Sequence, residues 1–382
     1  MDIPLNKAFI DDEELAAIAE VLRSRRVGGD GPVTRQVELD MARRFGAGDV
    51  LLTSSCTHAL ELALMVLDVG PGDEVICPSF TFTSTANAVV RQRARPVFAD
   101  IEAVTLGLDP DDVAPLITPR TRAIVVVHYG GVACDMNRID EIAARHGLVV
   151  IEDAAHGVGA RYHGRYLGTL GDIGCYSFHE TKNLTCGEGG AFLTRRREYA
   201  RAAEIIREKG TDRAAFVRGE VDKYTWRGVG SSFVLSDVLA AMLAVQLRKL
   251  DEISRRRLAI YERYLAGLRA LEKAGDLLLP TVPPACETNA HVFHVRFQDE
   301  STRDRCQRAL RAAGIQAAFH FVPLHSAPYG RQLAGEIGRP LPVTDLVSRT
   351  MLRLPLFPEL RDDEVDLVIS RMRDFFGTDG GS

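Results

Sequence analysis

Between residues 50 and 153 the sequence alternates short apolar runs with longer segments of helical pattern. This alternation limits the possible fold more than any other feature. The apolar runs cover residues 50–53, 74–77, 96–99, 123–127 and 148–151. They are apolar throughout, as expected when helices cover both faces of a parallel sheet. The pattern therefore predicts an α/β fold with a large, doubly wound and mostly parallel sheet.

The remaining chain predicts a second, smaller domain. A long helical pattern runs from about Leu235 to Leu271 and ends before Pro280. Two helices are expected near the start, at 11–26 and 34–45, the second with Thr34 as its N-cap. We expect a large ligand-binding domain at 1–248 and a small C-terminal α+β domain at 249–382. In the small domain, strands are predicted at 292–295, 316–320 and 352–355, and helices at 302–313, 343–351 and 362–376.

Composition excludes several classes of function. The net charge of −5 argues against a general nucleic-acid binder. No apolar run is long enough to cross a membrane, and the N-terminus has no signal-peptide pattern, so a cytoplasmic protein is expected. The seven cysteines are scattered, and neither His291 with His294 nor His320 with His325 has the spacing of a helical ligand pair. We therefore expect no metal site.

Lys182 lies in an unusual position, between a β-prone run at 172–178 and a glycine-rich turn. A second β-prone run follows at 191–194. Lysine is costly to bury, and burial lowers the pKa of its amine, which frees it to form a Schiff base. The simpler alternative is a solvated lysine in a surface loop. This stretch alone does not separate the two.

Three further groups follow the predicted strands, where ligands bind in doubly wound sheets. Hydroxyls near Ser55 open a helix and suit an anion, although a plain N-cap explains them equally well. Phe80 and Phe82 follow the second strand, and either can stack on a planar ring or pack in the core. Asp153 lies just after the strand at 148–151 and needs a cationic partner or a capping role. Together with Lys182, these groups are the contacts that hold pyridoxal 5′-phosphate.

Longer stretches resemble one family over nearly the whole chain. The sequence resembles the DegT-type sugar-nucleotide aminotransferases of fold-type I, which depend on pyridoxal 5′-phosphate. Within that family it is most similar to the transaminases that form dTDP-4-amino-4,6-dideoxygalactose. The stretches are Leu51–Thr57, Gly72–Val75, Ser79–Asn87, His128–Cys134, Ile151–Ala155, Ser177–Asn183, Ile205–Thr211, Val221–Arg227 and Phe319–His325.

The resemblance implies catalytic roles for two residues. Lys182 forms the Schiff base with the cofactor, and Asp153 pairs with the pyridinium nitrogen. His156 stands where the family often has a glutamine that hydrogen-bonds the phenolic oxygen. His179 and His325 match positions near the sugar-binding pocket.

The resemblance also implies cofactor contacts. Phe82 and Ala155 hold the ring between them, and Ser232 replaces an asparagine that reaches the phosphate of a neighbouring subunit. The remaining cofactor-binding residues are those expected around the phosphate: Ser55, Cys56, Thr57 and Ser177.

The implied reaction is transamination of a dTDP-4-keto-6-deoxyhexose with L-glutamate, giving dTDP-4-amino-4,6-dideoxyhexose and 2-oxoglutarate. A homodimer with cofactors near the interface is expected. The alternative of a sugar aminotransferase that acts on the 3-keto position or on another nucleotide sugar stays open. Lys182 argues against the family's sugar dehydratases, in which histidine replaces this lysine. A non-enzymatic regulatory relative with a vestigial site is a further alternative, and it predicts a protein without the cofactor's colour.

Overall fold

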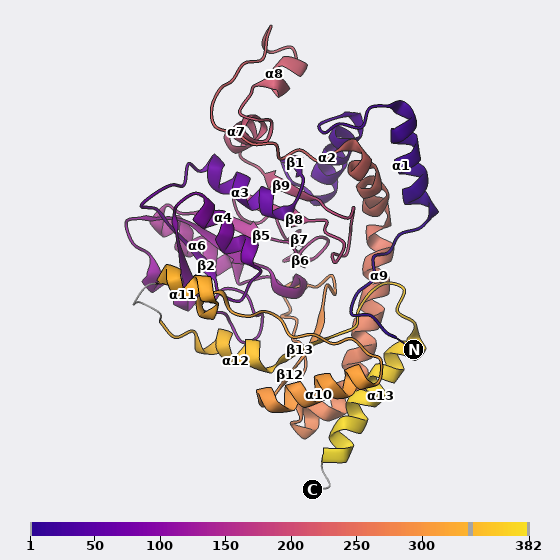
Figure 1. The fold of residues 1–382 in the computed structure, drawn as a ribbon. Coiled ribbons are helices and arrows are strands. Elements are labelled where there is room, and N and C mark those ends of the chain that lie inside the picture. The colour runs from indigo at the N-terminus through magenta and orange to yellow at the C-terminus, as the bar shows by residue number, and fades with distance from the viewer. Residues whose placement is uncertain (1, 335–338, 380–382) are drawn as a thin grey trace.

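The structure is a computed structural model that describes residues 2–334 and 339–379. A seven-stranded sheet forms its centre (Figure 1), and every strand except β9 runs parallel to the others. This confirms the predicted doubly wound, mostly parallel sheet. In spatial order its strands are β1 (Asp49–Thr53), β9 (Gly190–Thr194), β8 (Ile173–Ser177), β5 (Val149–Asp153), β4 (Thr121–Val127), β2 (Glu74–Pro78) and β3 (Arg95–Ala99).

Helices cover both faces of this sheet, which is why its strands are apolar throughout. One face buries its side chains against α3 (Cys56–Val66), α4 (Thr83–Arg91) and α7 (Arg197–Arg207). The other face packs against α2 (Pro32–Phe45), α6 (Met136–His146) and the first half of α9 (Asp237–Ala274). Helix α1 (Asp12–Ser24) lies along α9, where the buried Glu14 accepts hydrogen bonds from Lys249. The short helix α5 (Pro110–Val113) and 3₁₀ turns at Ala114–Leu116 and Tyr129–Gly131 complete this part.

The C-terminal part has its own apolar core, at the lower end of Figure 1. An antiparallel sheet of β10 (Leu277–Leu278), β12 (Phe293–Phe297) and β13 (Met351–Leu354) packs against α10 (Glu300–Ala312), α13 (Asp362–Asp379) and the second half of α9. Ile3 also enters this core. The predicted domain division at residues 248 and 249 falls inside the uninterrupted helix α9, and it stays a prediction.

Short elements connect the two parts. The 3₁₀ turn Leu324–Ser326 and the helices α11 (Pro328–Ala334) and α12 (Pro342–Thr350) lie between the small sheet and the large one. Strand β11 (Cys286–Glu287) pairs with β6 (Arg161–Tyr162), which pairs with β7 (Arg165–Tyr166). In the described ranges no helix is both long and apolar enough to cross a membrane.

The local predictions differ from the structure at three points. Helix α2 begins at Pro32 with Gly31 as its N-cap, so the predicted cap at Thr34 is wrong. Thr34 is buried and donates a 2.6 Å hydrogen bond to Asp237. The predicted strand at 316–320 is also wrong, because only one isolated bridge joins Ala318 to Arg353. The predicted irregular stretch at 209–231 contains a short helix, α8 (Arg213–Val217).

Candidate active site

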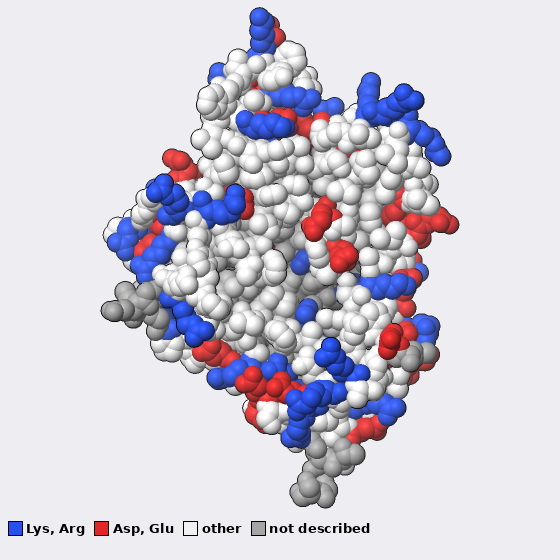
Figure 2. Space-filling model, viewed as in Figure 1, with Lys and Arg blue, Asp and Glu red and all other residues white. Residues whose placement is uncertain are grey.

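A cavity of about 550 Å³ lies at the carboxyl ends of the parallel strands, and residues of the C-terminal part also line it. Figure 2 shows the corresponding hollow, with Lys or Arg atoms at its bottom and Asp or Glu atoms at its rim. From the large domain it is lined by Ser55, Cys56, Thr57, Thr81, Phe82, Ser84, Asp153, Ala155, His156, Ser177, His179, Lys182 and Glu188. From the small domain, His291, Val292, His320, Phe321, Arg353, Leu354 and Leu356 complete the wall.

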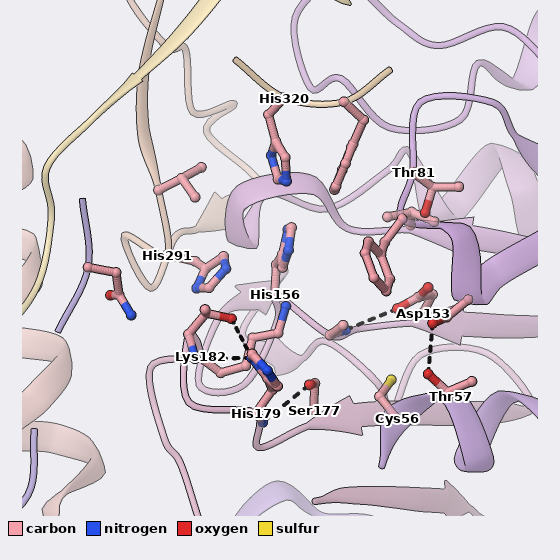
Figure 3. A pocket seen from close by; sticks show the side chains of 18 of the residues that line it. Cys56, Thr57, Thr81, Asp153, His156, Ser177, His179, Lys182, His291 and His320 are labelled. Atoms are coloured by element: carbon pink, nitrogen blue, oxygen red, sulfur yellow. Dashed lines mark hydrogen bonds between the residues drawn. The ribbon is translucent and has the colours of Figure 1, made fainter. Parts of the chain in front are cut away.

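Lys182 enters the cavity from the turn after β8 (Figure 3). Its backbone N–H donates a 2.9 Å hydrogen bond to the carbonyl of His179, which closes this turn. Burial lowers the pKa of the Lys182 amine, while Cys56 and Asp153 act in the opposite direction. The neutral amine is the nucleophilic form. The alternative of a solvated surface lysine is therefore wrong.

Asp153 is the last residue of β5 and is buried at the cavity wall. Its Oδ2 accepts a 2.7 Å hydrogen bond from Thr85 Oγ1, and its Oδ1 accepts one of 3.3 Å from the N–H of Ala155. Burial raises the pKa of Asp153, and these two hydrogen bonds and Lys182 oppose that rise. None of the ion pairs in residues 2–334 and 339–379 includes Asp153. The carboxylate is thus suited to a cationic group that enters the cavity.

Two helices begin beside each other at one end of the cavity. Ser55 caps α3, and its Oγ accepts a 3.1 Å hydrogen bond from the N–H of His58. Thr57 Oγ1 in α3 lies 2.7 Å from Ser84 Oγ in α4. A Cβ on Gly190 would lie 2.4 Å from the backbone nitrogen of Cys56, so glycine is required for β9 to pass the start of α3. Hydroxyls and helix N-termini together suit a phosphate group.

Two histidines, His156 and His291, lie in the wall opposite these helices, and their hydrogen bonds fix their tautomers. His156 Nδ1 accepts the N–H of Gly130 at 3.3 Å, so its proton is on Nε2. The side-chain amide nitrogen of Asn183 donates to the carbonyl of Asn289, so Asn183 Oδ1 accepts a 2.9 Å hydrogen bond from His291 Nδ1. The His156 and His291 rings lie 4.2 Å apart.

Burial, followed by the charge of Lys182, lowers the pKa of both His156 and His291 well below the usual range. Both rings are therefore neutral at neutral pH. His291 and His320 were considered from the sequence only as metal ligands. Within the described chain no group of three or more metal-ligating side chains forms.

The two aromatic candidates after β2 have different positions. Phe80 is fully buried and packs against Tyr129, with 5.1 Å between ring centroids. Phe82, at the start of α4, is 62% exposed and lines the cavity, as does Ala155. Of the two, only Phe82 can contact a bound ring.

The three remaining candidates lie at the mouth of the cavity or outside its wall. His179 lines the mouth, with its Nδ1 2.9 Å from Thr181 Oγ1. His325 is not part of the cavity wall, and its Nδ1 lies 2.7 Å from Ser79 Oγ, within hydrogen-bond distance. Ser232 is exposed and forms a bridge with Glu208 outside the wall. The substrate role of His325 and the trans-subunit role of Ser232 stay predictions.

The side chains that line the cavity are chemically suited to bind pyridoxal phosphate. It combines an amine of lowered pKa, a buried carboxylate with space for a cationic partner, and hydroxyls at two helix starts. Several further wall residues were missed from the sequence because no local pattern marks them: Thr81, Ser84, Glu188, His291, His320 and Arg353.

Comparison with known proteins agrees with this chemistry. The model of the DegT/DnrJ/EryC1/StrS aminotransferase family matches residues 8–373. The spore coat polysaccharide biosynthesis protein SpsC of Bacillus subtilis is 36% identical over 379 residues, covering 97% of this chain and 96% of SpsC. The crystal structure of the aminotransferase TlmJ from Streptoalloteichus hindustanus is 35% identical, with a TM-score of 0.91 over 99% of this chain and all of TlmJ.

A putative sugar aminotransferase from Streptococcus pneumoniae is similar in both its PLP and PMP forms. The PLP form is 26% identical, with a TM-score of 0.91 over 99% of each chain. The PMP form is 27% identical, with the same TM-score, over 99% of this chain and 100% of that one. The chain thus belongs to the DegT/DnrJ/EryC1/StrS family and is a pyridoxal phosphate-dependent aminotransferase of fold-type I.

Proposed function

We propose that the protein transfers the amino group of L-glutamate to the keto carbon of a dTDP-4-keto-6-deoxyhexose. The products are dTDP-4-amino-4,6-dideoxyhexose and 2-oxoglutarate. The observation that carries the proposal is the position of Lys182 and Asp153 in one cavity beside two helix starts. The 4-keto position is supported by the nine sequence stretches that resemble the dTDP-4-amino-4,6-dideoxygalactose transaminases.

In this proposal the cofactor is held by residues from several strand ends. Ser55, Thr57 and Ser177 bind its phosphate together with the N–H groups that begin α3, and Cys56 lies between them. Phe82 and Ala155 contact the two faces of the ring. His156 donates from Nε2 to the phenolic oxygen, which its tautomer permits.

Bound pyridoxal phosphate supplies an electron sink and carries the amino group between the two substrates. Asp153 stabilises a proton on the ring nitrogen, and Thr85 keeps the carboxylate oriented toward it. Lys182 Nζ removes the proton from Cα of the donor and returns a proton to the sugar carbon that receives the amine. The lowered pKa of Lys182 provides the unprotonated amine that the first step requires.

A homodimer is part of the proposal. The segment 209–231 exposes several large apolar side chains: Phe216, Val217, Tyr224, Trp226 and Val229. Such a cluster is typical of a protein–protein interface. Ser232 follows this segment directly, and we place it near the phosphate of the neighbouring subunit. A cytoplasmic location, free of nucleic-acid and membrane partners, also stays a prediction.

The test is an assay with a panel of substrates. The purified protein is incubated with pyridoxal phosphate, L-glutamate and dTDP-linked 4-keto and 3-keto sugars, and the product structures are determined by NMR. Formation of a 4-amino sugar supports the proposal. A 3-amino product, or reaction only with another nucleotide sugar, would select the alternative substrate. No amino sugar at all, from a colourless protein, would favour a vestigial site.

A further inference from the structure

His291 has no role in the proposed reaction, yet it contacts the residue that directly follows Lys182. It precedes β12 and faces the cavity beside His156 (Figure 3). Its Nδ1 donates a 2.9 Å hydrogen bond to Oδ1 of Asn183, whose side-chain nitrogen donates at 2.9 Å to the carbonyl of Asn289. Both bonds are buried and join positions 108 and 106 apart in the chain. The turn that carries Lys182 is therefore tied to a distant segment, residues 289–291.

Asn289 connects the same segment to the other side of the cavity. Its side-chain nitrogen donates 2.8 Å hydrogen bonds to the carbonyls of His156 and Val158. Its Oδ1 accepts a 3.1 Å hydrogen bond from the N–H of His291. A Cβ on Gly131 would lie 2.0 Å from this Oδ1, so glycine is required there to leave room for Asn289. One segment thus holds the backbone on both sides of the proposed cofactor site.

Arg257 of α9 holds this segment from outside the cavity. Its Nε donates a 3.0 Å hydrogen bond to the carbonyl of Ala290, and its Nη2 donates one of 2.7 Å to the carbonyl of His291. Ala290 has a φ of 50°, in the left-handed region, which persists only where neighbouring contacts enforce it. The two hydrogen bonds from Arg257 are contacts of this kind.

The burial of Arg257 is itself unfavourable. The side chain is 1% exposed, and none of the ion pairs in the described part of the chain includes it. Burial lowers the pKa of its guanidinium. An apolar side chain at such a position is often equally stable or more stable. The arginine therefore indicates that the backbone of residues 290–291 has to be held in place.

We propose that His291 and Arg257 are positioning residues for Lys182. Arg257 fixes the backbone of His291, and His291 fixes Asn183 and with it the turn that carries Lys182. This inference rests on the proposed role of Lys182 as the residue that moves the proton. Such a transfer requires the amine at a fixed distance from the reacting carbon, and a displacement of ~1 Å can slow the step about 100-fold.

Hydrogen–deuterium exchange of the holoenzyme, measured by mass spectrometry, reports on this turn without relying on turnover. In His291→Leu, the amides of residues 179–187 exchange about 3- to 10-fold faster, as expected for the loss of one buried hydrogen bond. In His291→Asn, the side-chain nitrogen takes the place of Nδ1, and exchange stays within about twofold of wild type. The peptide that covers β9 keeps its protection in both variants, which excludes general unfolding.

Arg257→Met tests whether the effect is transmitted, because Arg257 does not line the cavity. The same turn exchanges faster, and the single-turnover rate with L-glutamate falls about 10-fold or more. The glutamate concentration at half-saturation stays within about twofold, because no binding contact is removed. Arg256→Met removes the adjacent guanidinium of α9, which pairs with Glu252, and changes neither the exchange nor the rate. If Arg257→Met does not fold, the two His291 variants still decide the inference.

Three results overturn the inference. The first is unchanged exchange of residues 179–187 in His291→Leu or in folded Arg257→Met. The second is equally fast exchange in His291→Leu and His291→Asn. The third is a loss of glutamate affinity at an unchanged single-turnover rate in His291→Leu, which would assign His291 to substrate binding. The exchange result does not depend on the chemistry of Lys182. If the turn loosens as expected but another lysine binds the cofactor, the proposed function fails and the contact of His291 with this turn stands.

Discussion

Thr85 Oγ1 donates a 2.7 Å hydrogen bond to Asp153 Oδ2, although the two residues are 68 positions apart in the chain. Because its proton goes to Asp153, Thr85 accepts the 2.7 Å hydrogen bond it shares with Thr81 Oγ1. The two hydroxyls therefore form a chain that ends at the carboxylate. Hydrogen bonds of this kind favour the charged form of an acid. They oppose the rise in the pKa of Asp153 that its burial causes.

The Thr85→Val variant tests this support. Removing the hydroxyl raises the pKa of Asp153, so the acid limb of the pH–rate profile moves to higher pH, by about one unit for a hydrogen bond of ~1–1.5 kcal/mol. Thr85→Ser keeps the donor and serves as the control, with an unchanged limb. An acid limb that stays in place or moves to lower pH in Thr85→Val would show that the hydrogen bond does not tune Asp153.

Asp153→Asn removes the charge but not the shape of the side chain. We expect the cofactor to be retained through the phosphate contacts, and turnover to fall by several factors of ten, each equal to ~1.36 kcal/mol in the barrier. Steady-state kinetics and cofactor content by absorbance provide the measurement. Turnover close to that of wild type would mean that Asp153 does not face the ring nitrogen.

His294 makes the stability of the protein depend on pH. Burial, followed by Arg296 and Arg353, lowers the pKa of His294 to about 3, whereas an unfolded histidine titrates near ~6.5. Between these values the unfolded chain binds the extra proton, so the free energy of unfolding decreases as pH falls, by ~1.36 kcal/mol per unit. Acidification from pH 7.5 to 5.0 therefore lowers the free energy of unfolding by about 2 kcal/mol through this single group.

Chemical denaturation at both pH values tests the effect. The His294→Gln variant loses less stability on acidification than wild type, by about the same 2 kcal/mol. His146→Gln, at an exposed position in the last turn of α6, is the control and behaves as wild type. An identical acid sensitivity in His294→Gln would contradict the assignment.

Asp237 couples the start of α9 to the start of α2. Its carboxylate accepts hydrogen bonds from the N–H groups of Val33 and Thr34 and from the Thr34 hydroxyl. Asp237→Ala leaves these donors without a partner, two of them from the buried Thr34, and lowers the free energy of unfolding by about 2–4 kcal/mol. Asp251, which is also on α9, has an exposed carboxylate that pairs with Arg44 of α2. Its replacement in Asp251→Ala lowers the free energy of unfolding by less than about 1 kcal/mol. Equal losses would contradict the coupling.

The strands and helices of the large sheet region could be predicted because their sequence patterns lie within short, continuous segments. Strands such as 123–127 are apolar along their whole length. In a parallel sheet, the residues that follow each strand lie at the carboxyl edge of the sheet, where ligands bind. That rule selects Ser55 and Asp153, and it leaves Phe80 and Phe82 as alternatives, of which only Phe82 lines the cavity.

The missed features depend on contacts between distant segments. Thr34 fits the pattern of an N-cap, but Asp237 replaces it by reaching the helix from 203 positions away. The segment 316–320 has the composition of a strand, yet it forms only an isolated bridge to β13. His291, His320 and Arg353 reach the cavity from the C-terminal part of the chain, far in sequence from the strands of the large sheet. No spacing within the sequence predicts that these distant residues meet.

Amino transfer in this protein depends on Lys182 as the residue that binds the cofactor covalently. The most direct measurement is reduction of the holoenzyme with sodium borohydride, followed by digestion and mass spectrometry of the peptides. We expect a pyridoxyl group on the peptide that contains Lys182, and no modified lysine in a Lys182→Ala variant that still binds the cofactor. A pyridoxyl group on another lysine, or steady formation of an amino sugar by Lys182→Ala, would contradict it.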